Sequence, residues 1–352
     1  MPDVAVNTDS VLPDYLQAVE REAALMDFAV TLTPQRRRSR LAPVLISVIR
    51  DEMDHLPDFL AHHRRMGVQE FLIMDNGSMD EGPAYLAAQK DVAVIRIERQ
   101  FCWQAKQGWI THAIRSIGQG RWFLVLDADE RLIYAEDEKF DLEQLAAQME
   151  ASDIWRVRGL LVDLYGDGPL TSATAASAAW FDAEGYYGRL DTRYRSMVGG
   201  PRLRALASEA NPIMPELTKY PLFRVSDGAG MIHPHFHWSF PGNDRSPCHL
   251  GLLHLKFTMP LARKLARALA EKNYWNDSAE YQAYDSALKA KPDLSLHYAG
   301  SARLRGADSL VQAGLIEPVA WQRHTLQRKW LLFRDRLAPK ARLEAWRQNT
   351  AS

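Results

Sequence analysis

The sequence has little of several features that mark specialised classes of protein. Only two of its 352 residues are cysteines, Cys102 and Cys248, which excludes a disulfide scaffold and is typical of a reducing compartment. No apolar run approaches the ~20 residues that a membrane-spanning helix needs. The N-terminus lacks the basic start and apolar run of a signal peptide. A cytoplasmic protein is therefore expected.

An excess of charge is also missing. The formal net charge is −1, so no general attraction to nucleic acid is expected, and no nucleic-acid partner is predicted. Residues 321–352 are the exception, because they contain eight Lys or Arg, only two acidic residues, and several aromatic ones. Such a tail can lie on an anionic membrane surface, or it can pack on its own domain with a solvated basic face. The first of these alternatives would give peripheral contact with the inner face of a membrane.

Two glycine-rich phosphate-binding motifs are absent where they would be needed. The first predicted strand ends in "RDEMDH" at 50–55, with no glycine for a dinucleotide-binding turn, and no P-loop motif occurs. A chain that handles phosphate without a glycine-rich loop commonly uses a divalent metal, and hard oxygen ligands suit Mg²⁺ or Mn²⁺.

What is present is a regular alternation of strands and helices. Short apolar runs rich in Val and Ile predict strands, and stretches with apolar residues at helical spacing predict helices between them. The order βαβαβαβ is typical of a parallel sheet covered on both faces, in which ligands bind at the carboxyl ends of the strands. The predicted strands lie in 42–52, 68–75, 92–98 and 122–130, and the helices in 55–67, 82–90 and 104–120.

Acidic clusters follow three of these strands. They are "RDE" at 50–52, "DNGSMD" at 75–80 and "DADE" at 127–130. Because the carboxyl ends of parallel strands share one edge of a sheet, the three clusters should converge on one crevice.

Asp127 and Asp129 form an Asp-x-Asp pair within a run read as strand 122–130. Residues i and i+2 of a strand face the same side, so both carboxylates should point at one ion that neutralises a diphosphate. The alternative is that Asp127 caps the next helix.

The segments "VIRDEMDHLPDFLAHHRRMGVQEFLIMDNGSMDEG" and "QGRWFLVLDADERLIY" resemble glycosyltransferases of the GT-A fold. The nearest likeness is to the family 2-like enzymes of bacterial surface polysaccharides, and the chain is also similar to family 92. The resemblance is good over 44–134 and looser beyond. It implies an α/β, Rossmann-like mixed sheet flanked by helices, with a C-terminal helical extension.

The resemblance also implies roles for individual residues. A nucleotide-sugar donor, a UDP- or GDP-sugar, is expected to contact Arg50, Asp51, Glu52, Asp75, Gln104, Lys106 and Asp127. The Mn²⁺ or Mg²⁺ cofactor is expected at Asp127, Asp129 and His254. The familiar run after the second strand has Thr where this chain has Met79.

An inverting transferase needs a carboxylate that deprotonates the acceptor hydroxyl. No Glu-Asp motif for this base is apparent, so Asp163, Asp182, Glu184 and Asp227 remain open. Asp182 is favoured because aromatic neighbours could stack on a sugar, and Asp163 is retained beside it. A turn residue is the structural alternative for Asp182.

The resulting hypothesis is a metal-dependent, inverting glycosyltransferase acting on a glycan or lipid-linked acceptor. Its predicted parts are an N-terminal leader helix in 1–40, the GT-A domain in 41–258 and a helical region in 259–352. Two alternatives stay open. One is a metal-dependent phosphatase or phosphotransferase with Asp127 as nucleophile, and the other is a non-catalytic scaffold that binds glycan or protein.

Overall fold

The computed structural model describes residues 8–30, 39–118, 120–152, 154–189, 196–225, 230–233, 236–238, 249–258 and 261–317. The basic tail of 321–352 and Asp227 lie outside the described residues. Within the described part of the chain, no helix combines the length and the apolarity that crossing a membrane requires.

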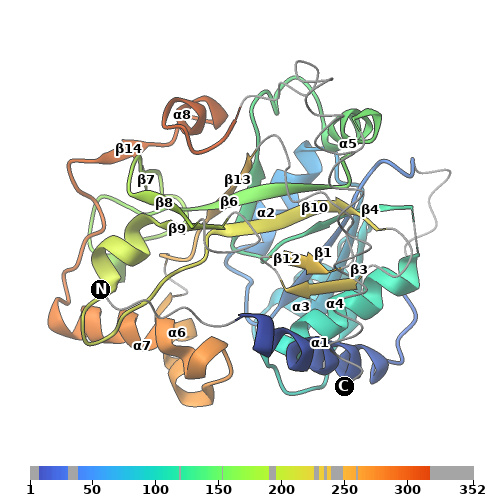
Figure 1. Cartoon of the computed structure of the whole chain (residues 1–352), viewed down its shortest axis with the longest axis horizontal. Helices are drawn as coiled ribbons and strands as arrows, with labels where there is room; N and C mark the ends of the chain where they lie inside the picture. The colour runs from blue at the N-terminus through green and yellow to red at the C-terminus, as the bar shows by residue number, and fades with distance from the viewer. Residues whose placement is uncertain are drawn as a thin grey trace.

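The first half of the chain folds as the strand and helix pattern predicts. Its four strands are parallel and lie in the order β3-β2-β1-β4. Helices connect each strand to the next, as Figure 1 shows. The elements are β1 (Val44–Ile49), α2 (Leu56–Arg65), β2 (Glu70–Asp75), α3 (Gly82–Ala87), β3 (Val92–Arg96), α4 (Trp103–Ile117) and β4 (Trp122–Val125).

The second half extends this sheet with strands of both directions. β10 (Thr218–Arg224) runs antiparallel between β4 and β6 (Arg156–Asp163). β13 (His249–His254) is parallel to β6, and β5 (Glu130–Ile133) closes the edge antiparallel to β13. The result is an eight-stranded mixed sheet in the order β3-β2-β1-β4-β10-β6-β13-β5. The predicted fold class, an α/β protein with a mixed sheet flanked by helices, is confirmed.

Alternate residues of the strands bury opposite faces of the sheet. Leu45 of β1 belongs to the core beneath α2, α5 (Leu142–Ala151) and α8 (Ala307–Gln312). Its neighbour Ile46 belongs to the core beneath α4. α1 (Thr8–Ala24) packs on the outside of α4, as Figure 1 also shows. Both faces of the sheet are therefore covered, and ligand access is left to its edges and strand ends.

The chain after β13 builds a third core with parts of the middle region. α6 (Leu261–Glu271) and α7 (Trp275–Ala290) pack with Tyr165, Leu206 and Phe257. β14 (Ser301–Arg303) then pairs antiparallel with β7 (Trp180–Asp182). The remaining elements are a 3₁₀ turn (Leu170–Ser172), a π-helical turn (Arg202–Leu206), and the hairpins β8 (Tyr186–Arg189) with β9 (Ser196–Gly199) and β11 (Gly230–His233) with β12 (Phe236–Trp238).

One expectation about the strands was wrong. Residues 122–130 do not form a single strand, because β4 ends at Val125 and β5 begins at Glu130. The amide of Glu130 donates to the carbonyl of Asp127 at 3.0 Å, which closes a turn between the two strands. Asp127 and Asp129 therefore lie at a chain reversal, and the strand rule that places i and i+2 on one side does not apply to them.

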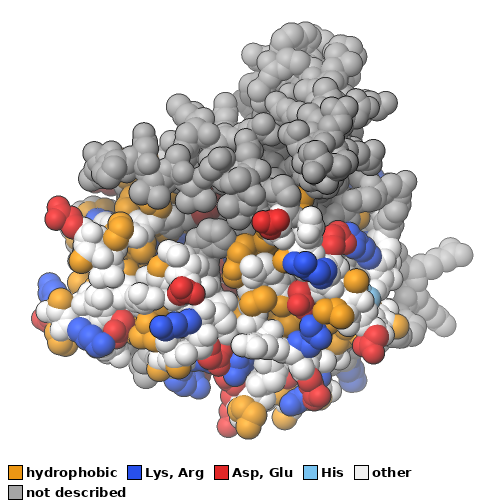
Figure 2. All heavy atoms as spheres, turned by 60° about the horizontal axis from the view of Figure 1, so that its bottom comes forward, with side chains coloured by type: hydrophobic (Ala, Val, Ile, Leu, Met, Phe, Trp, Pro, Cys, Tyr) orange, Lys and Arg blue, Asp and Glu red, His pale blue; other side chains and the backbone are white. Residues whose placement is uncertain are grey.

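The described surface carries both signs of charge close together. On the face in Figure 2, Lys and Arg side chains alternate with Asp and Glu side chains, and hydrophobic atoms lie between them. This mixture agrees with the small net charge of the whole chain.

Candidate functional site

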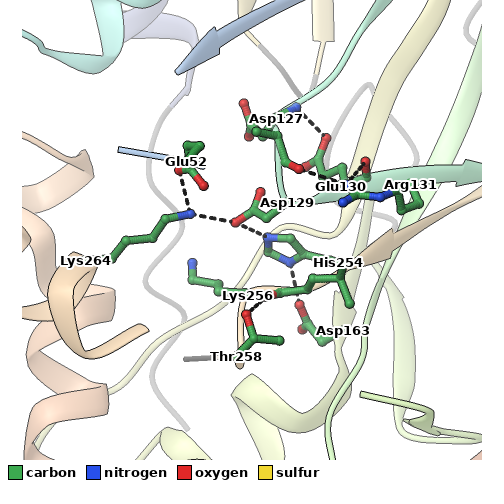
Figure 3. A network of polar contacts seen from close by, with 12 residues as sticks. Glu52, Asp127, Asp129, Glu130, Arg131, Asp163, His254, Lys256, Thr258 and Lys264 are labelled. Carbon is green, nitrogen blue, oxygen red and sulfur yellow. Dashed lines mark hydrogen bonds and ion pairs between the residues drawn. The ribbon is translucent and has the colours of Figure 1, made fainter. Parts of the chain in front are cut away.

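Charged side chains gather where β1, β4 and β13 end, as Figure 3 shows. The backbone brings them together in two ways. Leu126, directly after β4, donates to Ile46 of β1, which fixes the turn beside the end of β1. On the other side, His254 at the end of β13 is level with Asp163 of β6 and Glu130 of β5. Residues at the ends of β1, β4, β6 and β13 and at the start of β5 thus meet at one edge.

Asp127 is held by two lysines. Lys106 of α4 pairs with its Oδ1, and Lys219 of β10 lies 3.0 Å from its Oδ2 and also pairs with Glu130. Partial burial raises the pKa of the Asp127 carboxyl, but the two ammonium groups lower it more, and the net shift is downward. Burial raises the pKa of Glu130 against the opposing effect of Lys219. Asp127 is therefore an ionised group with both oxygens occupied by cations.

Asp129 has a separate set of partners. Lys264 of α6 lies 3.0 Å from Asp129 Oδ2 and 2.8 Å from Glu52 Oε1, so one ammonium bridges two carboxylates. Burial raises the pKa of Asp129, but Lys264, His254 and the nearby His55 lower it well below its ordinary value. Burial raises the pKa of Glu52 to about 7, with Lys264 opposing the shift. The two aspartates of the Asp-x-Asp pair therefore bind different lysines.

His254 is oriented by Asp163. The ring Nδ1 lies 2.6 Å from Asp163 Oδ1, and Arg202 donates to the other carboxylate oxygen at 2.8 Å. Burial raises the pKa of Asp163, while Arg202 and His254 lower it to a net downward shift. An ionised Asp163 accepts hydrogen bonds only, so the hydrogen of the imidazole is on Nδ1. The Nε2 atom then faces Asp129 Oδ2 at 3.8 Å.

The residues at the end of β1 contact α6. Asp51 has a left-handed backbone (φ 55°), accepts from the Met79 amide at 2.7 Å, and pairs with Arg267 of α6 at 2.5 Å. Arg50 pairs with Glu271 at 3.2 Å. An open cavity of about 400 Å³ lies beside these contacts, lined by Asp51, Met79, Asp80, Glu81, Arg263, Lys264 and Arg267. Its volume is within the range of small-molecule sites.

Two further predicted residues lie near the same strand ends. Asp75, at the end of β2, is buried and accepts from the amide of Ser78 at 3.0 Å, which shapes the loop that leads to Met79. Gln104 lies in the first turn of α4, half a turn before Lys106. Asp75 therefore stabilises the conformation of the loop that borders the cavity.

Asp182 belongs to a different environment. It lies at the end of β7, and its side chain is buried. Arg204 donates to both of its oxygens at 2.9 Å, and the Tyr165 hydroxyl donates to Oδ1 at 2.5 Å. The guanidinium of Arg204 lies in turn 3.8 Å over the ring of Tyr298. Since both oxygens are engaged, proton transfer to Asp182 would require Arg204 to move.

Asp129 and His254 fit one part of a divalent-metal site. A carboxylate and an imidazole whose other nitrogen is fixed by Asp163 are ligands suited to Mn²⁺. Among the described residues no group of three or more His, Cys, Asp or Glu side chains is arranged to hold an ion. Phosphate oxygens and water would have to supply the remaining ligands, which is usual for Mg²⁺ sites at phosphates.

Three residues of the site were not predicted from the sequence: Glu130, Lys219 and Lys264. A lysine within the apolar strand run "KYPLFR" was an available signal, because a buried ammonium is costly unless it is paired. The basic face of "LARKLARALAE", with Arg263, Lys264 and Arg267, was another. Glu130 was visible in the sequence, but nothing there indicated that it would be fully buried.

No protein-family model and no curated protein matches the chain. Among solved structures, S. aureus TarS (residues 1–349) aligns at 12% identity over 38% of this chain and 42% of that one, with a TM-score of 0.25. The mannosyltransferase PcManGT from Pyrobaculum calidifontis, in complex with GDP-Man and Mn²⁺, aligns at 16% identity over 42% of each chain, with a TM-score of 0.25.

A third structure covers more of the chain. A putative glucose-1-phosphate thymidylyltransferase from Bacillus anthracis, in complex with a sucrose, aligns at 8% identity over 77% of this chain and 93% of that one, again with a TM-score of 0.25. The chain spans about two fifths of TarS and of PcManGT. At a TM-score of 0.25 a likeness carries no inference about substrate or site, which must come from this chain's own residues.

Proposed function

We propose that the chain is a glycosyltransferase that moves a sugar from a UDP- or GDP-sugar to a glycan or lipid-linked acceptor, with Mn²⁺ or Mg²⁺ as cofactor. One observation supports this most. Asp129 faces His254 and pairs with Lys264, which lines an open cavity. Two further lysines, Lys106 and Lys219, pair with the neighbouring Asp127. A metal-ligand pair surrounded by cations matches a reaction whose leaving group is a nucleoside diphosphate.

Each part of the donor has a counterpart in this arrangement. The cavity beside Asp51 and Met79 would take the nucleoside, and Asp75 holds the loop that leads to Met79. Arg50, next to Asp51 in the chain, now pairs with Glu271. Lys106 and Lys219, now paired with Asp127, would face the diphosphate or the ribose. A bound divalent ion held by Asp129 and His254 would supply Lewis-acid stabilisation of the departing diphosphate.

Inversion at the sugar carbon would require a carboxylate base. Asp163 is better suited to positioning, because His254 and Arg202 occupy both of its oxygens. Asp182 stays a proposal for the base on the condition that Arg204 releases it when an acceptor binds. Turnover of an Asp182→Asn variant tests this condition.

A phosphotransferase that uses Asp127 as nucleophile has weaker support. A nucleophilic carboxylate needs an oxygen that can approach phosphorus in line, and both oxygens of Asp127 are bound by lysines. The same lysines favour a role for Asp127 in holding cationic groups beside a phosphate.

The cytoplasmic location and the membrane contact of the tail remain predictions from the sequence.

The decisive experiment is a thermal-shift screen of UDP, GDP, CDP, dTDP and ADP, each with and without MnCl₂. Binding at 100 times the dissociation constant stabilises a fold by about 2.7 kcal/mol, which is readily detected. A shift that needs both Mn²⁺ and one nucleotide, and that disappears in Asp129→Ala, is the expected result. If no nucleotide shifts the wild-type chain under either condition, the proposal is wrong.

A further inference from the structure

The Lys264 ammonium lies between two carboxylates of the candidate metal site. It is 3.0 Å from Asp129 Oδ2 and 2.8 Å from Glu52 Oε1, and only 13% of its side chain is exposed. Figure 3 shows it approaching Asp129 from the side opposite His254. The Asp129 oxygen that faces His254 Nε2 is thus the same oxygen that Lys264 contacts.

One carboxylate oxygen cannot serve a buried ammonium and a divalent ion equally well. Two cations a few ångströms apart repel by several kcal/mol even at an effective dielectric constant of about 20. Metal binding at Asp129 and His254 must therefore weaken or displace the Lys264 contact. Glu52, whose other oxygen Oε2 is buried without a hydrogen-bond partner among the described residues, keeps a site for the ammonium nearby.

The helix that carries Lys264 also lines the cavity. Arg263 and Arg267 of α6 pair with Asp54 and Asp51, so all three cations of this helix face carboxylates of the segment after β1. The same three side chains border the open cavity of about 400 Å³. A phosphate group that enters the cavity would find these cations at its wall.

We propose that Lys264 is a resident counter-ion of the donor site, which competes with the divalent metal for Asp129 and then pairs with the donor's diphosphate. This inference rests on the proposed function, since it takes the metal and the diphosphate from it. The exchange makes metal binding weak in the absence of nucleotide and stronger in its presence, because the displaced ammonium gains a new anionic partner. Lys264 is a positioning residue in this scheme.

The test compares Mn²⁺ binding without nucleotide in the wild type and four variants by titration calorimetry and by the electron paramagnetic resonance signal of free Mn²⁺. Lys264→Met should bind Mn²⁺ more tightly than the wild type, by about tenfold or more. Lys264→Arg, which keeps the charge, should bind it as weakly as the wild type. The control is Lys289→Met, because Lys289 is an exposed lysine of α7 that pairs with Asp285 instead of Asp129. It removes the same charge from a solvent-screened position and should change the affinity by less than about threefold.

The affinity of Lys264→Met for nucleotide should change in the opposite direction to its affinity for Mn²⁺. With Mn²⁺ saturating, Lys264→Met should bind UDP or GDP at least about tenfold more weakly than the wild type, because the diphosphate loses a cation. Equal Mn²⁺ affinity in Lys264→Met and wild type, with loss of binding in Asp129→Ala, would overturn the exchange and leave the proposed metal site intact. Absence of Mn²⁺ binding in every chain, with and without nucleotide, would overturn the proposed function and the exchange together.

A measurement on the wild-type chain covers the case in which Lys264→Met does not fold. Acetylation of lysines by an N-hydroxysuccinimide ester, read by mass spectrometry, reports how accessible each amine is. The reactivity of Lys264 should rise several-fold with MnCl₂ alone and fall when UDP or GDP is added. Lys289, an exposed lysine paired with Asp285, is the internal reference. Unchanged reactivity of Lys264 under all conditions would overturn the proposal.

Discussion

His254 donates its Nδ1 hydrogen to Asp163 at 2.6 Å, and this bond decides which atom of the ring is available to the site. Asp163 is itself held by Arg202, which also pairs with Glu280 of α7 at 3.0 Å. A chain of ion pairs thus runs from α7 to Asp163 and the imidazole. The orientation of His254 Nε2 toward Asp129 therefore depends on residues that have no direct contact with the candidate metal.

Replacing Asp163 tests this dependence. In Asp163→Asn the amide oxygen accepts less strongly and Arg202 keeps only one of its two carboxylate partners, Glu280, so His254 is no longer fixed in one tautomer. We expect Mn²⁺-dependent nucleotide binding to weaken by about 10- to 100-fold, as is usual when the group behind a metal-binding histidine is changed. Calorimetric titration of nucleotide with Mn²⁺ measures the effect. Wild-type affinity in a folded variant would contradict the positioning role.

Asp182→Asn is the complementary variant, because Asp182 is buried and ion-paired like Asp163 but contacts Arg204 and Tyr165. Mn²⁺-dependent nucleotide binding should stay within about twofold of the wild type. If Asp182 is the base, sugar transfer should fall by at least about 100-fold. Retained transfer would remove Asp182 from the candidates for the base.

Lys219 stabilises two carboxylates at once, and its removal should be costly. In Lys219→Met the fully buried Glu130 loses its cation, while Asp127 keeps Lys106. Removing one partner of a buried pair typically costs about 3–5 kcal/mol. The free energy of unfolding in urea should fall by this amount, and the additional change Glu130→Gln should recover part of it.

The control for this experiment is Lys139→Met. Lys139 pairs with Glu136 on the surface, where 71% of the lysine side chain is exposed, so its loss should change the stability by less than about 1 kcal/mol. Equal effects of the two lysine variants would show that the Lys219 cluster is not stabilising.

A buried histidine should make the stability depend on pH. His63 of α2 is fully buried; its Nδ1 donates to the Phe59 carbonyl at 2.8 Å, and its Nε2 accepts from the Leu132 amide at 3.3 Å. The neutral ring satisfies both contacts, and burial lowers its pKa well below the ordinary value. In the unfolded chain the pKa returns to about 6.5.

The unfolded state therefore binds more protons than the folded state below pH ~6.5, and stability falls as the pH drops from there. One such group contributes at most about 1.4 kcal/mol per pH unit. Urea unfolding of wild type and His63→Gln between pH 7.5 and 5 measures the contribution. The variant should show the shallower dependence, and identical slopes would exclude His63 as a source.

The sequence predicted the parallel half of the sheet because its signals are local. Each of β1 to β4 is a short apolar run followed by polar residues, so the ends of β1, β2 and β4 could be placed at one edge. The contact between His254 and Asp163 could not be predicted from the sequence. These residues are 91 positions apart, and only the parallel alignment of β13 with β6 makes them neighbours.

The error at Asp127 and Asp129 has a physical cause as well. The run "WFLVLDADE" is apolar and then acidic, and nothing in its pattern distinguishes a strand that continues from one that reverses. The reversal depends on β5 pairing with β13, more than a hundred residues later. In the same way, Lys219 and Lys264, which pair with Asp127 and Asp129, come from β10 and α6, and only the folded chain brings them to the turn.

The packing of α1 on α4 gives a prediction at a single glycine. A Cβ added to Gly108 of α4 would lie 2.5 Å from the Cβ of Glu22 and 2.9 Å from the amide nitrogen of Ala23, so the two helices would have to separate. Overpacking of this kind usually costs about 1–3 kcal/mol. Gly108→Ala should therefore lower the melting temperature, although alanine favours a helix. Gly168→Ala, where only Ser172 Oγ lies within 4 Å, is the control and should have a smaller effect. If the melting temperature of Gly108→Ala rises instead, helix propensity has prevailed, and α1 does not pack on α4 as closely as the structure shows.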